Sequence, residues 1–173
     1  NLRPEYSHSA SLSADYYIQI GNNVQFNLLL EGFYTNLDDV FALRVIGHNQ
    51  QTQTTIQERY NASGAVVKGI SLTAKMSYKD IMTISAAYTL QSSRYKETEY
   101  WSEDENVAGT DKLLRSPDDY GYISLDYTPI KRLGFNLSGT YTGKMLVQHF
   151  AGYVDNDCEK LTKFNYFLVF KIG

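Results

Sequence analysis

This chain of 173 residues has few of the residues that build disulfide frameworks or metal centres. It contains one cysteine, Cys158, and a single cysteine cannot form an intrachain disulfide. The three histidines, His8, His48 and His149, are far apart and lack the spacing of a zinc motif, so we expect no metal site. The sequence also lacks a glycine-rich phosphate loop and a Gly-x-Ser-x-Gly elbow. We therefore expect neither an enzyme nor a bound cofactor.

Neither sign of charge dominates the chain. Lys and Arg number 16, Asp and Glu number 19, and the cations are spread along the sequence, which gives a net charge of -3. A nucleic-acid-binding protein would show a basic patch or stripe, so no nucleic-acid partner is expected. No apolar run approaches the roughly 18 residues of a membrane helix. The mean hydropathy of -0.36 still permits a membrane β-barrel, because only alternate side chains of a barrel strand face lipid.

Tyrosine is present in unusual number, with 15 copies against one tryptophan. Aromatic residues make up 14% of the chain, and they are enriched in β-strands. From Ala10 to Ile20 apolar and polar residues alternate, which is the period of a strand and not of a helix. Gly21-Asn22-Asn23 is a turn signal, and the alternation resumes from Val24 to Tyr34. These two runs predict a hairpin.

Further alternating runs extend this pattern along the chain. A weaker stretch over residues 37–60 is consistent with strands that run into a loop. The clearer runs are Ile70–Tyr78, Met82–Leu90, Ile123–Tyr127, Leu133–Val147 and Asn165–Ile172. Together they predict an all-β fold, an antiparallel up-and-down meander of about seven long strands.

The connections between these runs fall into two classes. Short turns are expected at residues 21–23, 79–80 and 128–132, and longer loops at 47–53, 96–118 and 148–162. Short turns on one rim and long loops on the other are typical of outer-membrane barrels. Runs of about ten residues also match the roughly 9–11 tilted residues that cross a bilayer. We therefore expect part of a larger transmembrane β-barrel, with its short turns in the periplasm.

The same alternation assigns side chains to the two faces of the barrel wall. Leu29 and Phe33 are apolar exceptions on the lumenal side, where a large lumen or a plug could accommodate them. Five tyrosines fall on the proposed lipid face, where some are expected in the interfacial girdles. These are Tyr16, Tyr34, Tyr78, Tyr127 and Tyr141.

Several local sequences have a recognisable pattern. The chain opens on Asn1-Leu2-Arg3-Pro4-Glu5 and continues with Glu31-Gly32-Phe33-Tyr34. Residues 61–64 precede the strand 67–72, and Pro117-Asp118-Asp119-Tyr120 follows. In combination, over nearly the whole chain, these segments resemble the C-terminal part of the barrel of TonB-dependent receptors.

The resemblance implies a function for a larger parent protein. Such receptors resemble 22-stranded barrels that are filled by a plug domain. They take up scarce nutrients (siderophores, haem, cobalamin or glycans) across the outer membrane of Gram-negative bacteria, energised through TonB. The implied partners are outer-membrane lipid, a small-molecule or glycan ligand, and the plug and TonB through a missing N-terminal part.

The boundaries of the sequence lead us to expect a fragment. The abrupt start at Asn1 and the absence of a signal peptide look like the middle of a protein. Barrels of this kind usually end their last strand on an aromatic residue, whereas this chain stops at Lys171-Ile172-Gly173. We expect residues 1–173 to be the C-terminal barrel segment of a receptor, without its plug domain.

One loop carries candidate ligand-binding residues. The longest predicted loop contains an acidic cluster that includes Glu103 and Asp104, beside Tyr100 and Trp101. Tyr100, Trp101, Glu103 and Asp104 could form a ligand rim or bind a cation. The plainer alternative is a solvated loop, in which these side chains bind nothing.

Two other architectures share the alternating pattern. In a soluble all-β ligand-binding or adhesive module, the apolar face would be buried between two sheets. An independent small outer-membrane barrel would need an even number of strands and a closing aromatic strand. Burial of the apolar face separates the soluble alternative from the membrane one.

Overall fold

A computed structural model describes residues 2–49, 54–101, 107–149, 160–164 and 167–172. These residues form β-strands joined by turns and loops, which confirms the all-β prediction. No helix that could span a membrane occurs among them. The strands are β1 (Tyr6–Ile20), β2 (Val24–Asp38), β3 (Phe41–Asn49), β4 (Thr54–Asn61), β5 (Ala65–Tyr78), β6 (Met82–Glu99), β7 (Thr110–Lys112), β8 (Asp119–Ile130), β9 (Leu133–Thr142), β10 (Met145–His149), β11 (Lys160–Phe164) and β12 (Phe167–Ile172).

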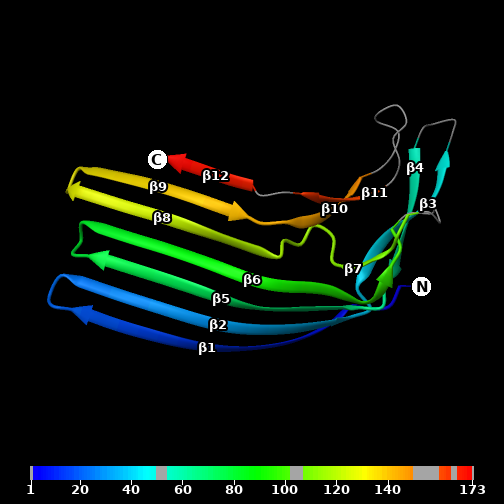
Figure 1. Cartoon of the computed structure of the whole chain (residues 1–173), viewed down its shortest axis with the longest axis horizontal. Helices are drawn as coiled ribbons and strands as arrows, with labels where there is room; N and C mark the ends of the chain where they lie inside the picture. The colour runs from blue at the N-terminus through cyan, green and yellow to red at the C-terminus, as the bar shows by residue number, and fades with distance from the viewer. Residues whose placement is uncertain (1, 50–53, 102–106, 150–159, 165–166, 173) are drawn as a thin grey trace.

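One antiparallel sheet dominates the structure. Its strands follow the order β1-β2-β5-β6-β8-β9-β12, which confirms the expected meander of seven strands, and the short β7 adds to the edge of β6. β3 pairs with β4 and β10 pairs with β11 in two separate hairpins. Figure 1 shows the long strands side by side, with the tight turns at one end and both hairpins at the other. We call these the turn end and the loop end.

The turn end follows the predicted turn residues with one correction. Gly21 and Lys79 adopt positive φ angles of 60° and 50° in the first two turns. The third turn is shorter than the predicted 128–132, because β8 continues through Pro129 and Ile130 pairs directly with Leu133. A shift of register after Tyr127 places Pro129 at an irregular position, where a missing N–H donor does not interrupt the ladder.

Strand register gathers the apolar side chains on one face. Ala14 pairs with Leu30, Leu30 with Leu72, and Leu72 with Tyr88. Side chains of directly paired residues lie on the same face of a sheet. We call this surface the apolar face. It comprises Leu12, Ala14, Tyr16, Ile18, Ile20, Val24, Phe26, Leu28, Leu30, Tyr34, Ile70, Leu72, Ala74, Met76, Tyr78, Met82, Ile84, Ala86, Tyr88, Leu90, Ile123, Leu125, Tyr127, Phe135, Leu137 and Tyr141. All five tyrosines assigned to the lipid face are among them.

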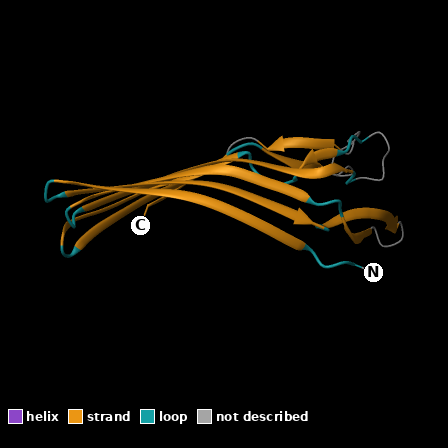
Figure 2. Ribbon diagram, turned by 90° about the horizontal axis from the view of Figure 1, so that it is seen from below, coloured by secondary structure: helices purple, strands orange, loops and turns teal. Residues whose placement is uncertain are grey.

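The apolar face is exposed. Leu12 is 82% exposed, Ile70 58% and Ile123 53%, and the buried apolar residues of the described chain are Ala62, Ala65 and Trp101. Figure 2 shows the main sheet edge-on as a single curved layer. A soluble two-sheet module would bury this face, so the arrangement disagrees with the soluble alternative.

The height of the apolar face matches a membrane. On β5 it runs from Tyr78 at the turn end to Ile70, and the next residue on that face is Lys68. On β2 the face runs from Val24 to Tyr34, and at about 3.3 Å per residue on a strand tilted by about 40° this span corresponds to a height of about 25 Å, the usual height of the apolar band of an outer-membrane barrel.

The opposite face of the sheet is rich in hydroxyl and amide groups, and we call it the polar face. The hydroxyl groups of Ser71 and Thr89 lie 3.0 Å apart across β5 and β6. The side chain of Asn136 donates a 2.7 Å hydrogen bond to Asp126 across β8 and β9. Such cross-strand pairs stabilise the wall without an apolar layer.

Phe33, an apolar exception of the polar face, is accommodated by a glycine. A Cβ atom added at Gly69, its partner on β5, would lie 2.6 Å from the Phe33 ring. A side chain at position 69 would displace the ring. Gly69 therefore provides the space that the sequence alone did not explain.

Two predicted boundaries near the loop end are wrong. β6 continues to Glu99, well into the expected loop of 96–118, and β7 also lies within that loop. The run 133–147 is divided into β9, which pairs with β8 and β12, and β10, which pairs with β11. Gly143 lies between the two strands and donates its N–H to the Asp119 carbonyl at 2.8 Å. The segment between β7 and β8 is irregular but bonded on both sides: Gln91 N–H donates to the Asp118 carbonyl, and Asp118 N–H donates to the Lys144 carbonyl.

Candidate functional site

A cavity of about 590 Å³ lies at the loop end, between the β3–β4 hairpin, the end of β6 and β10. Ligand pockets commonly have volumes of about 300–1,000 Å³. Its lining includes aromatic side chains from several elements, two amides, one carboxylate and one guanidinium. The lining residues are Phe41, Ala42, Leu43, Gln57, Tyr60, Tyr95, Glu99, Tyr100, Trp101, Thr110, Leu114, Arg115 and Gln148.

Glu99 ties the β3–β4 hairpin to the end of β6. Its carboxylate accepts hydrogen bonds from the Tyr60 hydroxyl at 2.8 Å, the Ser63 N–H at 3.1 Å and the Ser63 hydroxyl at 3.2 Å. Burial, and after it the Glu99 carboxylate, raises the pKa of Tyr95 above its ordinary value. Both effects favour the neutral form of Tyr95, which is one of the residues that line the cavity.

A second set of contacts fixes the base of the same hairpin. Asn61 donates its side-chain amide to the carbonyls of Arg3 at 2.9 Å and of Asp39 at 2.7 Å. The Arg3 guanidinium lies 2.7 Å from the Asp39 carboxylate. Lys96 forms an ion pair with Asp38. The contacts of Asp39 and Asn61 thus fix the base of the β3–β4 hairpin, and the Lys96–Asp38 ion pair joins the end of β2 to β6 beside it.

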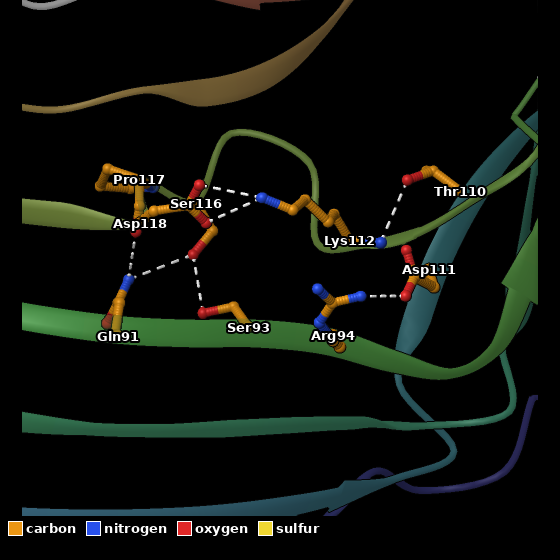
Figure 3. Close-up of polar contacts among 9 residues, drawn as sticks. All are labelled: Gln91, Ser93, Arg94, Thr110, Asp111, Lys112, Ser116, Pro117 and Asp118. Carbon is orange, nitrogen blue, oxygen red and sulfur yellow. Dashed lines mark hydrogen bonds and ion pairs between the residues drawn. The ribbon is translucent and has the colours of Figure 1, made fainter.

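Polar contacts also hold the segment 110–118 against β6 (Figure 3). The Gln91 side chain donates to the Pro117 carbonyl at 2.9 Å, and the Ser116 hydroxyl donates to Ser93 at 3.0 Å. Arg94 forms an ion pair with Asp111 at the start of the segment. Because Leu114 and Arg115 lie within this segment, the contacts position them at the cavity.

The structure brings part of the predicted site together. Tyr100 and Trp101 both line the cavity, with Tyr100 64% exposed and Trp101 5% exposed. Glu103 and Asp104 lie outside the described residues, so their prediction is not tested. Among the residues that are described, no group of His, Cys, Asp and Glu side chains is placed to hold a metal ion.

Sequence reasoning missed most of the cavity wall. Phe41 and Tyr60 belong to the weak stretch 37–60, whose strand boundaries were uncertain. Glu99 lies on the part of β6 that was assigned to the loop 96–118, and Tyr95 lies between that loop and the predicted run Met82–Leu90. The available signal was the alternation of β6 itself. Ala87, Thr89, Gln91 and Ser93 place the odd-numbered residues on the polar face, and the same alternation continued to residue 99 would have placed Tyr95 and Glu99 there too.

The sequence matches the family model described as TonB dependent receptor-like, beta-barrel, over residues 1–161. The chain belongs to this family. TonB-dependent receptors are outer-membrane proteins of Gram-negative bacteria, and they are receptors and transporters and not enzymes. The described sheet is thus a partial barrel, which confirms the predicted fold class and the predicted resemblance.

Two solved receptors have similar folds. The siderophore receptor PirA from Acinetobacter baumannii is 17% identical, with a TM-score of 0.60, over 99% of this chain and 25% of its own. The FrpB iron transporter from Neisseria meningitidis (F3-3 variant) is 15% identical, with a TM-score of 0.53, over 96% of this chain and 24% of its own. This TonB-dependent receptor segment therefore spans about a quarter of the length of either protein. No curated protein matches it.

Proposed function

We propose that residues 1–173 are the C-terminal barrel segment of an outer-membrane receptor that takes up a scarce nutrient, energised through TonB. The observation that carries the proposal is a single-layer sheet with an exposed apolar face, a polar face, and an aromatic cavity beyond the apolar face at the loop end. The nutrient is a siderophore, haem, cobalamin or a glycan. In this role the segment is part of a transporter and has no catalytic activity.

The apolar face contacts the acyl chains of the outer membrane in this proposal. Its height of about 25 Å fits the band that such barrels present to lipid. Tyr78 and Tyr127 stand near the turn end of the face, where aromatic rings of an interfacial girdle are expected. The loop end, with the cavity, then faces the outside of the cell.

The polar face surrounds the plug of the complete receptor. Glu31 and Lys75 lie on this face, and no oppositely charged side chain within the described residues is within ion-pair distance of either. A plug that carries a cation opposite Glu31 and an anion opposite Lys75 would satisfy both charges. TonB would act through the plug, on the N-terminal side of this segment.

The ligand enters at the loop-end cavity. Tyr100 and Trp101 line it, and Glu103 and Asp104 follow directly in the sequence. Aromatic side chains with a few polar groups are the usual lining of a small-molecule site. We therefore propose that all four residues contribute to ligand capture, as expected from the sequence.

The experiment compares uptake by the full-length receptor in cells with and without TonB. Cells are given each candidate nutrient as the limiting source, and receptor-dependent growth on one of them, lost without TonB, is expected. Tyr100→Ala should lower the uptake of that nutrient, whereas Tyr6→Ala, at a residue of similar exposure (58%) outside the cavity lining, should not. Full-length protein found in washed cytosol and absent from outer membranes would reject the proposal.

A further inference from the structure

Within the described residues, the cavity lining contains two charged residues, Glu99 and Arg115, and only Glu99 has hydrogen-bond partners for its charged group. The carboxylate of Glu99 already accepts three hydrogen bonds, one from Tyr60 and two from Ser63. Arg115 is an exposed residue of this lining, and its guanidinium has no carboxylate within ion-pair distance in the described part of the chain. A ligand in the cavity therefore meets a spare positive charge and an anion whose hydrogen-bonding capacity is largely used.

Neighbouring cations of the same segment are not available in this way. Arg94 is paired with Asp111, and Lys112 lies 2.9 Å from Asp118. Neither residue belongs to the cavity lining. Arg115 thus differs from these two cations both in belonging to the cavity lining and in lacking an acidic partner among the described residues.

The backbone holds Arg115 in an unusual conformation. Its φ angle is +58°, in the left-handed region that a long side chain rarely adopts. Its N–H donates a 2.8 Å hydrogen bond to the Leu146 carbonyl of β10, which fixes the residue between β6 and β10. Strained backbone of this kind is concentrated at binding sites, where the surrounding structure maintains it.

The other feature of the cavity is exposed aromatic surface. Phe41 is 43% exposed and Tyr100 is 64% exposed, although both lie at the loop end beyond the apolar face. Apolar rings that face water in a cavity favour a ligand with a flat apolar body that covers them. The amides Gln57 and Gln148 add hydrogen-bonding groups without adding charge.

We propose that Arg115 is a specificity-determining residue that selects an anionic ligand with a flat aromatic body. The guanidinium offers paired N–H donors that match the two oxygens of a carboxylate or a similar oxyanion. The ring of the ligand lies against Phe41 and Tyr100, and its anionic group reaches Arg115. This assignment rests on the proposed function, because it names the class of nutrient that enters the same cavity.

Three probes that share a ring and differ in charge test the assignment: 2-naphthoate, 2-naphthamide and 2-naphthylmethylammonium. Binding to the purified full-length receptor in lipid nanodiscs is measured by equilibrium dialysis, and binding to empty nanodiscs is subtracted. We expect 2-naphthoate to bind at least about tenfold more tightly than the neutral amide, as a charge-assisted hydrogen bond allows. The cationic probe should bind most weakly.

Variants separate Arg115 from a general effect of charge. Arg115→Gln should remove the preference for 2-naphthoate, and Arg115→Lys should retain part of it. The matched control is Arg59→Gln, which removes an exposed arginine from the same end of the molecule but outside the cavity lining. The control should keep the preference.

Equal binding of the three probes, tighter binding of the cation, or a preference that survives Arg115→Gln would overturn the assignment. So would a receptor that imports its nutrient but binds none of the probes. A receptor that shows the Arg115-dependent preference but no TonB-dependent uptake would instead reject the proposed function and leave this assignment standing.

Discussion

The Tyr60 hydroxyl and the Glu99 carboxylate form a 2.8 Å hydrogen bond between residues 39 positions apart in the sequence. Tyr60 is the next-to-last residue of β4 and Glu99 ends β6, so this bond joins a hairpin outside the main sheet to the longest strand within it. With the two bonds from Ser63, it gives the cavity wall a fixed position relative to the barrel.

Replacement of Glu99 should loosen that wall. Glu99→Ala removes the acceptor of three hydrogen bonds, and we expect the free energy of local opening of the β3–β4 hairpin to fall by about 2 kcal/mol. Hydrogen exchange of the amides of β4 in the full-length receptor measures this as faster exchange. Glu97→Ala is the control, because Glu97 is exposed and outside the cavity lining. Unchanged exchange in Glu99→Ala would contradict the role of this residue.

Close packing of β6 against β8 should make Gly121 intolerant of a side chain. A Cβ atom there would lie 2.5 Å from the Ala87 carbonyl and 3.0 Å from the Tyr88 ring. We expect Gly121→Ala to lower the stability of the folded receptor by about 1–3 kcal/mol, measured as a lower denaturation midpoint in detergent. Gly32→Ala, on the same face with nothing within 4 Å of the added atom, should be tolerated. Equal effects of the two substitutions would argue against steric conflict as the cause.

A charge on the apolar face should oppose insertion. Leu72 lies near the middle of this face on β5, and we expect Leu72→Arg to destabilise the membrane-inserted receptor by about 2–4 kcal/mol. The measurement is the amount of heat-modifiable receptor in isolated outer membranes. Thr73→Arg places the same charge on the polar face one residue away and should have a much smaller effect. Similar losses for both variants would contradict the assignment of the two faces.

The ion pair of Asp38 and Lys96 should make a small, pH-dependent contribution to stability. Lys96, as hydrogen-bond donor, lowers the pKa of Asp38 below its ordinary value of 3.8. A lowered pKa in the folded state stabilises the fold above the ordinary pKa, and this contribution disappears as pH falls through the lowered value. The melting temperature of Lys96→Gln should therefore be below that of the unchanged receptor at pH 7, and the difference should shrink below about pH 4.

Lys68→Gln is the control for this ion pair, because Lys68 is exposed and lacks a carboxylate partner in the described chain. Its melting temperature should follow that of the unchanged receptor across the same pH range. A pH-independent difference for Lys96→Gln would show that the lysine stabilises the receptor by packing and not through Asp38.

Much of the main sheet could be predicted because its pattern is local. Alternation from Ala10 to Ile20 and from Val24 to Tyr34 fixes which side chains share a face, and Gly21 marks the turn between them. The boundary at Gly143 could not be predicted, because it depends on which partner each strand takes: β9 stays in the main sheet and β10 pairs with β11. Residues that appear continuous in an alternating run can thus belong to two strands.

The cavity was less accessible to sequence reasoning. Tyr100 and Trp101 were identified as candidates from residue type, but Phe41 and Arg115 were not. Phe41 reaches the cavity because its hairpin leaves the main sheet and is tied to Glu99 through Tyr60. Arg115 reaches it because polar contacts hold its segment against β6. Neither relationship has a local signature in the sequence.

The sequence by itself determined an all-β wall with one apolar and one polar face, since a period of two is a property of each strand alone. It also carried the family resemblance that the family match confirmed. Tertiary structure decided how the loop end is built, where β6 ends, and that Tyr60, Glu99, Tyr100 and Arg115 meet at one cavity. Those features depend on contacts between residues far apart in the chain, whose geometry is set by strand register and by side-chain hydrogen bonds.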